Sequence, residues 1–193
     1  MNLPNKLTIM RIILVPFCVF FIAYPILGEI VSPIVALVIF CVTSLTDMLD
    51  GKIARKYNLV TDFGKFLDPV ADKLLIIGSY SAILFAHRTE TLFASFAFWA
   101  LFIIFFRELA VTSMRAIVIG KVDVAANWMG KVKTVSQMAC VIVVLIEPLV
   151  CKLFSIDTHS IASIVLLVFS AFMALISGIN YFIAYWPHLK PNK

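Results

Sequence analysis

The sequence predicts an all-α protein, a bundle of six transmembrane helices with both termini in the cytoplasm. Hydrophobic residues make up 62% of the 193 residues, charged residues make up 14%, and the mean hydropathy is +1.04. A soluble domain carries about 25% charged residues. The apolar residues stand in continuous runs, which favours membrane-spanning helices over the alternating strands of a membrane barrel. This composition excludes a disordered chain, a disulfide scaffold and a soluble nucleic-acid-binding protein.

Six runs are long enough to cross a bilayer, which takes about 20 apolar residues. They are residues 9–28, 31–53, 66–87, 91–117, 134–153 and 160–186. Pro25 and Gly28 close the first run, Glu147 and Pro148 close the fifth, and Pro187 follows the sixth. Residues 1–8 are expected to form an interfacial lead-in to the first helix, because the sequence shows no convincing cleavage site of a signal peptide.

Basic residues predict the orientation of the bundle. Six spans place the N-terminus, the second and fourth loops and the C-terminus on one side, and this side with its helix ends carries 14 of the 16 lysines and arginines. Arg88 and Lys152 fall on the other side. The positive-inside rule therefore places both termini in the cytoplasm. No linker or repeat divides the chain, so residues 1–193 are expected to form a single membrane domain.

Four aspartates stand near the cytoplasmic ends of the second and third predicted helices. Asp47 and Asp50 are spaced i, i+3, and Asp68 and Asp72 are spaced i, i+4, so each pair shares one face of its helix. The two helices are consecutive and antiparallel, so both pairs lie near the joining loop and are expected to converge. A charged side chain at a helix centre in a bilayer costs about 2.5–3.5 kcal/mol. An unpaired set of four is therefore not expected.

Two divalent cations would balance four carboxylates, and hard oxygen ligands favour Mg²⁺ or Mn²⁺ over zinc. The alternative is that the aspartates pair with basic residues close to them in the sequence, which are Lys52, Arg55, Lys65 and Lys73. Small residues also stand between the two pairs, at Gly51, Ala54 and Gly64. They allow the close approach of a ligand or, as the alternative, of a neighbouring helix.

Residues 47–72 resemble the signature of the CDP-alcohol phosphotransferase family, D-x2-D-G-x2-A-R-x8-G-x3-D-x3-D. Every fixed position matches: Asp47, Asp50, Gly51, Ala54, Arg55, Gly64, Asp68 and Asp72. The resemblance implies six transmembrane helices, a homodimer, a CDP-linked donor that releases CMP, and a two-metal site of the four aspartates at the cytoplasmic face. It also implies that Asp72 is the general base. The residues implied to cradle the cytidine nucleotide are Gly51, Ala54, Arg55 and Gly64.

Three further segments, residues 2–16, 106–115 and 130–138, resemble the phosphatidylglycerophosphate synthases within that family. This resemblance implies transfer of a phosphatidyl group from CDP-diacylglycerol to glycerol 3-phosphate. A phosphate dianion in a low-dielectric pocket calls for several cations, and the candidates are Arg107, Arg115, Lys131 and Lys133. The alternative for these four residues is an ordinary basic rim at the membrane face.

Asn5, Thr8 and Arg11 are candidates to contact the phosphates or the lipid groove of the donor, although an ordinary helix start also explains Asn5 and Thr8. Other acceptors stay open within the family, namely inositol phosphate, serine or phosphatidylglycerol. A divalent-cation transporter is the alternative from another class, since carboxylates inside a membrane also mark ion paths. The expected partners are membrane lipid and no nucleic acid. The expected location is a bacterial inner membrane, with a mitochondrial membrane as the alternative.

Overall fold

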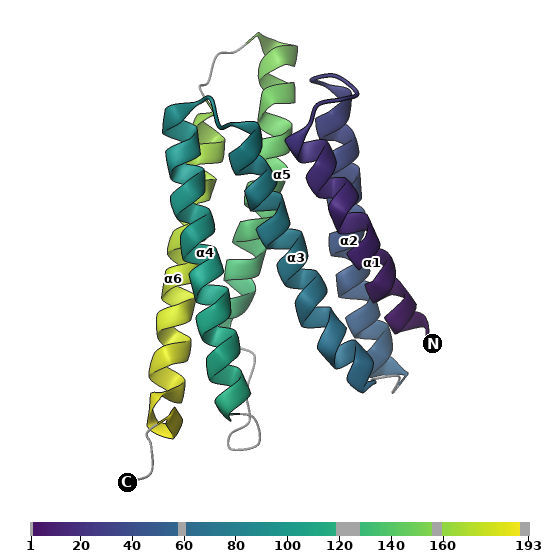
Figure 1. Cartoon of the computed structure of the whole chain (residues 1–193), viewed down its shortest axis with the longest axis vertical. Coiled ribbons are helices and arrows are strands. Elements are labelled where there is room, and N and C mark those ends of the chain that lie inside the picture. Colours follow the sequence, from purple (N-terminus) through teal and green to yellow (C-terminus); the bar gives the residue numbers. More distant parts are fainter. Residues whose placement is uncertain (1, 58–60, 119–127, 156–159, 190–193) are drawn as a thin grey trace.

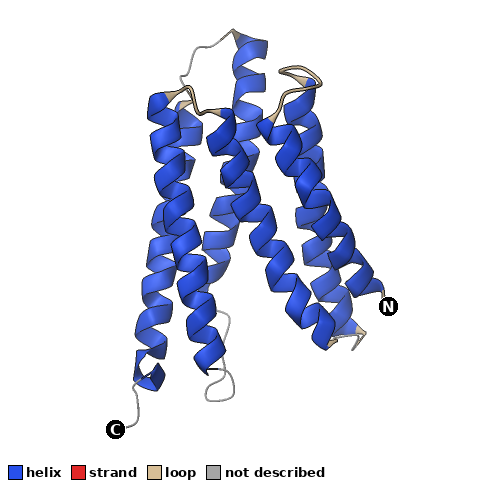
Figure 2. Cartoon of the chain, viewed as in Figure 1, coloured by secondary structure: helices blue, strands red, loops and turns tan. Residues whose placement is uncertain are grey.

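The computed structural model describes residues 2–57, 61–118, 128–155 and 160–189. The described residues form six helices: α1 (Leu3–Ala23), α2 (Val31–Lys56), α3 (Asp62–Ala86), α4 (Thr91–Val118), α5 (Trp128–Phe154) and α6 (Ile161–Leu189). Each helix is long and apolar enough to cross a membrane, and Figure 2 shows helix in every element between short connections. The prediction of an all-α bundle of six membrane-spanning helices is therefore confirmed.

The helices form two groups that diverge toward one end of the bundle. In Figure 1, α1, α2 and α3 lie on one side, α4 and α6 lie on the other, and α5 lies behind and between them. The start of α1, the end of α2, the start of α3 and the end of α6 lie at the same end, which we call the terminal end. The buried core that joins the groups includes Phe40, Leu75, Ile83, Ile104 and Leu167.

The first helix begins earlier than predicted. Asn2 caps it by accepting a hydrogen bond from the backbone N–H of Asn5, and Pro4 stands in its first turn. Both are known start signals of a helix. The predicted interfacial lead-in over residues 1–8 is therefore wrong for the described residues, because Thr8 already lies inside α1. The helix ends at Ala23, five residues before the predicted end of the first run.

The third helix also begins before its apolar run. Thr61 caps α3 by accepting a hydrogen bond of 3.1 Å from the backbone N–H of Gly64, and Asp62 lies in the first turn. A side-chain cap and an acidic first turn both stabilise a helix N-terminus. As a result, Asp68 and Asp72 lie within regular helix near the terminal end of the bundle, at a fixed angle to each other.

The fifth helix passes through the residues that were predicted to end it. α5 continues to Phe154 through Pro148, and Glu147 lies within the helix. Its carboxylate accepts hydrogen bonds from the backbone N–H groups of Ala162 (3.1 Å) and Ser163 (2.8 Å) and from the Ser163 hydroxyl. Glu147 therefore satisfies N–H groups that the start of α6 would leave unpaired. Pro187 likewise lies inside α6 and does not follow it.

Candidate active site

A buried arginine of α1 lies between two of the predicted aspartates. The Arg11 side chain is fully buried, and its two terminal nitrogens donate separately to Asp47 and Asp50 on α2. Asp50 is only 3% exposed. The i, i+3 spacing turns both carboxylates toward α1, where one planar guanidinium reaches both. The expected alternative partners of these aspartates were basic residues of α2 and α3, and Arg11 was not among them.

Two more residues of α1 meet the start of α3. The Thr8 hydroxyl donates to Asp68 Oδ1 over 2.8 Å, and Asn5 Oδ1 accepts from the Thr61 hydroxyl over 3.0 Å. A Cβ added to Gly64 would lie 3.0 Å from Asn5 Oδ1. Gly64 thus lets α1 and α3 approach closely, so helix packing explains this glycine. Its role toward a nucleotide stays a prediction.

The two aspartate pairs lie within electrostatic reach of each other. Asp50 interacts with Arg11, Asp47 and Asp68, and Asp72 interacts with Lys133, Asp47 and Arg11. The groups therefore lie toward the terminal end of the bundle, on α1, α2, α3 and α5. Arg11 donates to two of the four carboxylates, and among the described side chains no lysine or arginine forms an ion pair with Asp68 or Asp72, so the group carries more negative charge than bonded positive charge.

The oxygen atoms of the four aspartates are suitable ligands for a hard divalent cation, although three of these carboxylates point to protein partners. Among the described residues, no three His, Cys, Asp or Glu side chains are placed around a common metal position. Asp47 and Asp50 instead hold Arg11, and Asp68 accepts from Thr8. Carboxylate oxygens are the ligands that Mg²⁺ prefers, and the unbalanced negative charge favours further cations. Arg11 thus supplies part of the positive charge that this site requires.

A cavity of about 740 Å³ opens beside Asp72 at the same end of the bundle. Its lining comes from five helices: Met48 and Lys52 of α2, Asp72 of α3, Arg107, Glu108 and Arg115 of α4, Gly130, Lys131, Lys133, Thr134 and Val135 of α5, and Tyr181 of α6. All four basic residues predicted to bind a phosphate therefore share one cavity with one of the predicted aspartates. Asp47, Asp50 and Asp68 lie toward α1, outside this lining.

Glu108 holds two of these cations in place. Its Oε1 accepts from Arg107 Nη1 over 2.9 Å and from Lys133 Nζ. Arg107 is 8% exposed and Lys133 is 6% exposed, so each needs a counter-charge close by. Lys131 and Arg115 are exposed where they line the cavity.

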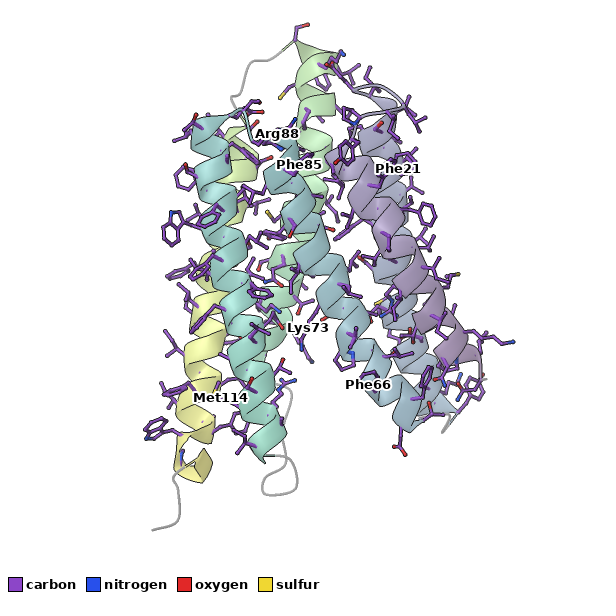
Figure 3. The ribbon with its side chains drawn as sticks, viewed as in Figure 1. Phe21, Phe66, Lys73, Phe85, Arg88 and Met114 are labelled. Atoms are coloured by element: carbon purple, nitrogen blue, oxygen red, sulfur yellow. The ribbon has the colours of Figure 1, made fainter. Side chains whose placement is uncertain are left out.

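Lys73 lies next to Asp72 on the α4 side of α3 (Figure 3). Its Nζ donates to the Thr112 hydroxyl over 2.7 Å and so joins α3 to α4. For the predicted nucleotide cradle, the structure places Gly51 and Ala54 half-buried on α2. The side chain of Arg55 lies outside the described part of the structure, so the cradle stays a prediction.

We expect Arg11→Met to destabilise the protein by about 3 kcal/mol or more when divalent cations are removed, because the variant leaves a buried carboxylate without its counter-charge. Arg11→Lys should lose less, since lysine keeps the charge and loses the two-pronged geometry. Thermal unfolding in detergent with EDTA measures both variants. In the Arg11→Met background, Asp50→Asn should restore part of the loss. An Arg11→Met variant as stable as wild type would contradict this account of the ion pair.

Comparison with known proteins identifies the family. A model of the family described as CDP-alcohol phosphatidyltransferase matches residues 1–176. The CDP-diacylglycerol–glycerol-3-phosphate 3-phosphatidyltransferase of Bacillus subtilis (strain 168) is 38% identical over 201 aligned positions, covering 99% of this chain and 98% of that protein. The protein of the same name from Escherichia coli (strain K12) is 39% identical over 150 positions, covering 76% and 78%. The alternative of a cation transporter finds no support in these matches. The chain therefore belongs to the CDP-alcohol phosphatidyltransferase family of enzymes.

Proposed function

We propose that the protein transfers the phosphatidyl group of CDP-diacylglycerol to glycerol 3-phosphate, which yields phosphatidylglycerol phosphate and CMP. The observation that carries this proposal is the shared cavity, in which Asp72 lies with Arg107, Arg115, Lys131 and Lys133. A small acceptor with a phosphate at one end and a hydroxyl at the other suits such a cavity. The names of the Bacillus subtilis and Escherichia coli relatives support the same reaction.

The basic residues bind and orient the acceptor. Arginine offers a planar fork that matches phosphate oxygens, and lysine adds a compact charge. Arg107 Nε is buried and has no hydrogen-bond partner among the described residues. Glu108 offsets part of the positive charge and keeps Arg107 and Lys133 together. With its phosphate held by these cations, the acceptor directs its free hydroxyl toward Asp72 on α3.

Asp72 accepts the proton of the attacking hydroxyl. The hydroxyl oxygen forms a bond to the phosphorus of the phosphatidyl group, while the bond from that phosphorus to the oxygen of CMP breaks. CMP leaves with the electron pair of the broken bond. Phosphoryl transfer of this kind depends mainly on positioning and on stabilisation of charge, and a carboxylate within reach of the hydroxyl is a suitable base.

The ligands that we propose for two Mg²⁺ or Mn²⁺ ions are Asp47, Asp50, Asp68 and Asp72. When bound, the ions would supply positive charge to the pyrophosphate of the donor and to the leaving group. Four carboxylates lie at the terminal end and, among the described residues, Arg11 is the bonded counter-charge of two of them, which supports this assignment. For the CDP-lipid, the proposed contacts are Asn5, Thr8, Gly51, Ala54, Arg55 and Gly64. Thr8 supports this set because its hydroxyl contacts Asp68, and Asn5 contacts Thr61 at the start of the same helix.

We expect purified protein with Mg²⁺ and CDP-diacylglycerol to release CMP only when glycerol 3-phosphate is added. Four basic residues around one cavity favour an acceptor that carries a phosphate dianion. A screen that also contains serine, inositol phosphate and phosphatidylglycerol measures the choice of acceptor through CMP release. Turnover with one of these three and not with glycerol 3-phosphate would overturn the proposed acceptor.

We expect Asp68→Asn and Asp72→Asn to lower CMP release by at least about 100-fold, because each removes a proposed ligand and Asp72→Asn also removes the base. Chelation with EDTA should abolish turnover of the wild type, and added Mg²⁺ should restore it. Asp62→Asn on the same helix is the matched control and should keep wild-type turnover. Manganese binding, followed by electron paramagnetic resonance, should weaken in both site variants while their thermal unfolding stays cooperative. Wild-type turnover in either variant would contradict the metal site.

We also propose that the enzyme is a homodimer in a bacterial cytoplasmic membrane, with its site facing the cytoplasm. The family resemblance, the bacterial relatives and the 14 basic residues of the predicted cytoplasmic side support this arrangement. On intact cells, an impermeant maleimide should label Lys152→Cys and spare Lys56→Cys, with wild-type protein as the background. Labelling of Lys56→Cys alone would reverse the orientation. Native mass spectrometry should find two chains per particle, and a single chain would contradict the dimer.

A further inference from the structure

One lining residue of the cavity, Tyr181, comes from α6, and the sequence did not indicate it. We infer that Ser177, Gly178 and Tyr181 form a positioning face, which holds Arg107 and Arg115 of α4 at the places where they bind the phosphate of the acceptor. This inference rests on the proposed function, and it assigns the affinity for the acceptor in part to residues that need not touch it. The three residues follow residue 176, where the match to the family model ends.

Arg107 is fixed by the first two residues of this face. Its Nη2 donates to the buried Ser177 hydroxyl over 2.8 Å. A Cβ added to Gly178 would lie 3.0 Å from Arg107 Cγ, so the stem of the arginine lies directly against the backbone of α6. Glu108 accepts from the other terminal nitrogen over 2.9 Å. The guanidinium is thus held from two helices, and its remaining orientations are few.

Arg115 is fixed by the third residue. Its Nη2 donates to the Tyr181 hydroxyl over 2.7 Å, and its guanidinium carbon lies 4.8 Å from the centre of the Tyr181 ring. The guanidinium carbon of Arg107 lies 5.5 Å from the same ring centre. The two arginines start about 12 Å apart along α4, yet both head groups meet at one aromatic ring. Cations within about 6 Å of a ring centre are attracted to its face.

Tyr181 is itself held firmly in place. It is 4% exposed, packs with Val111, Tyr185 and Met114, and stacks on the Tyr185 ring at 5.8 Å. Figure 3 labels Met114 on α4 near the terminal end. A Cβ added to Gly130 would lie 3.3 Å from the Tyr181 hydroxyl oxygen, so the first turn of α5 also closes over it.

Two arginine head groups at one place repel each other before a phosphate arrives. The ring face and the two hydroxyl oxygens offset part of this repulsion and set the separation of the guanidinium groups. A binding site whose supporting residues are locked by packing loses little conformational freedom when it binds its ligand. The face on α6 therefore prepares the pocket for the phosphate and takes no part in the chemical step.

The test compares Tyr181→Phe with Tyr185→Phe. The first change removes the oxygen that accepts from Arg115 and keeps the ring; the second removes the hydroxyl of the stacked neighbour, which lies outside the cavity lining. We expect Tyr181→Phe to raise the KM for glycerol 3-phosphate by roughly three- to ten-fold, because the variant loses the one hydrogen bond that Arg115 donates to this residue. The kcat and the KM for CDP-diacylglycerol should stay at wild-type values. Tyr185→Phe should change none of these constants.

Ser177→Ala and Gly178→Ala test the contact to Arg107. Both should raise the KM for glycerol 3-phosphate with kcat unchanged, the first through a lost hydrogen bond and the second because Arg107 must move away from the new methyl group. Calorimetric titration of detergent-solubilised protein with glycerol 3-phosphate, in the absence of turnover, should show that both variants bind this acceptor more weakly than the wild type does. This binding measurement separates a weakened pocket from a weakened chemical step.

Two results would overturn the inference. One is that Tyr181→Phe and Ser177→Ala bind and use glycerol 3-phosphate as Tyr185→Phe does. The other is that kcat and the unfolding temperature fall while both KM values rise, which is the mark of a purely structural role. Either result leaves the proposed reaction standing, provided that the wild type uses glycerol 3-phosphate. If the wild type neither binds nor uses this acceptor, the proposed function fails first, and the inference fails with it.

Discussion

The counter-charge of buried aspartates is the constraint on which the terminal end of the bundle depends. Asp50 is almost fully enclosed, and the guanidinium of Arg11, equally enclosed, donates both to it and to Asp47. Removing either partner from such a pair leaves a charge in a medium that solvates it poorly. The pair therefore ties α1 to α2, and with the contact of Thr8 to Asp68 it also brings α1 to α3. The acidic half of the site is thus built around the first helix.

In the basic half of the site, which holds the cations of the cavity, buried positive charges are likewise held by a counter-charge. Glu108 sits between Arg107 and Lys133 and joins α4 to α5, while the hydroxyl groups of Ser177 and Tyr181 tie the arginines of α4 to α6. Asp72 borders both halves. Its electrostatic partners come from α1, α2, α4 and α5, so the proposed base lies between the two halves. Every helix of the described bundle thus contributes a polar group to one end.

The helices and the aspartates could be predicted from sequence, because continuous apolar runs and i, i+3 or i, i+4 spacing are local signals. The helix ends were less predictable. An acidic residue followed by proline predicts a helix end at Glu147 and Pro148, yet a proline in a packed membrane helix costs a local hydrogen bond and does not end the helix. The partner of Asp47 and Asp50 was missed because Arg11 is 36 residues away in the chain, and only packing brings α1 to α2. Tyr181 was missed because one aromatic residue in an apolar helix carries no pattern.

A crystal structure with Mn²⁺ and glycerol 3-phosphate bound would test the central claim most directly, since the anomalous signal of manganese locates the ions independently of any mechanism. The account predicts manganese among Asp47, Asp50, Asp68 and Asp72 and a phosphate in the cavity against Arg107 and Arg115. Manganese at another place, with the four aspartates pointing apart or toward lipid, would contradict it.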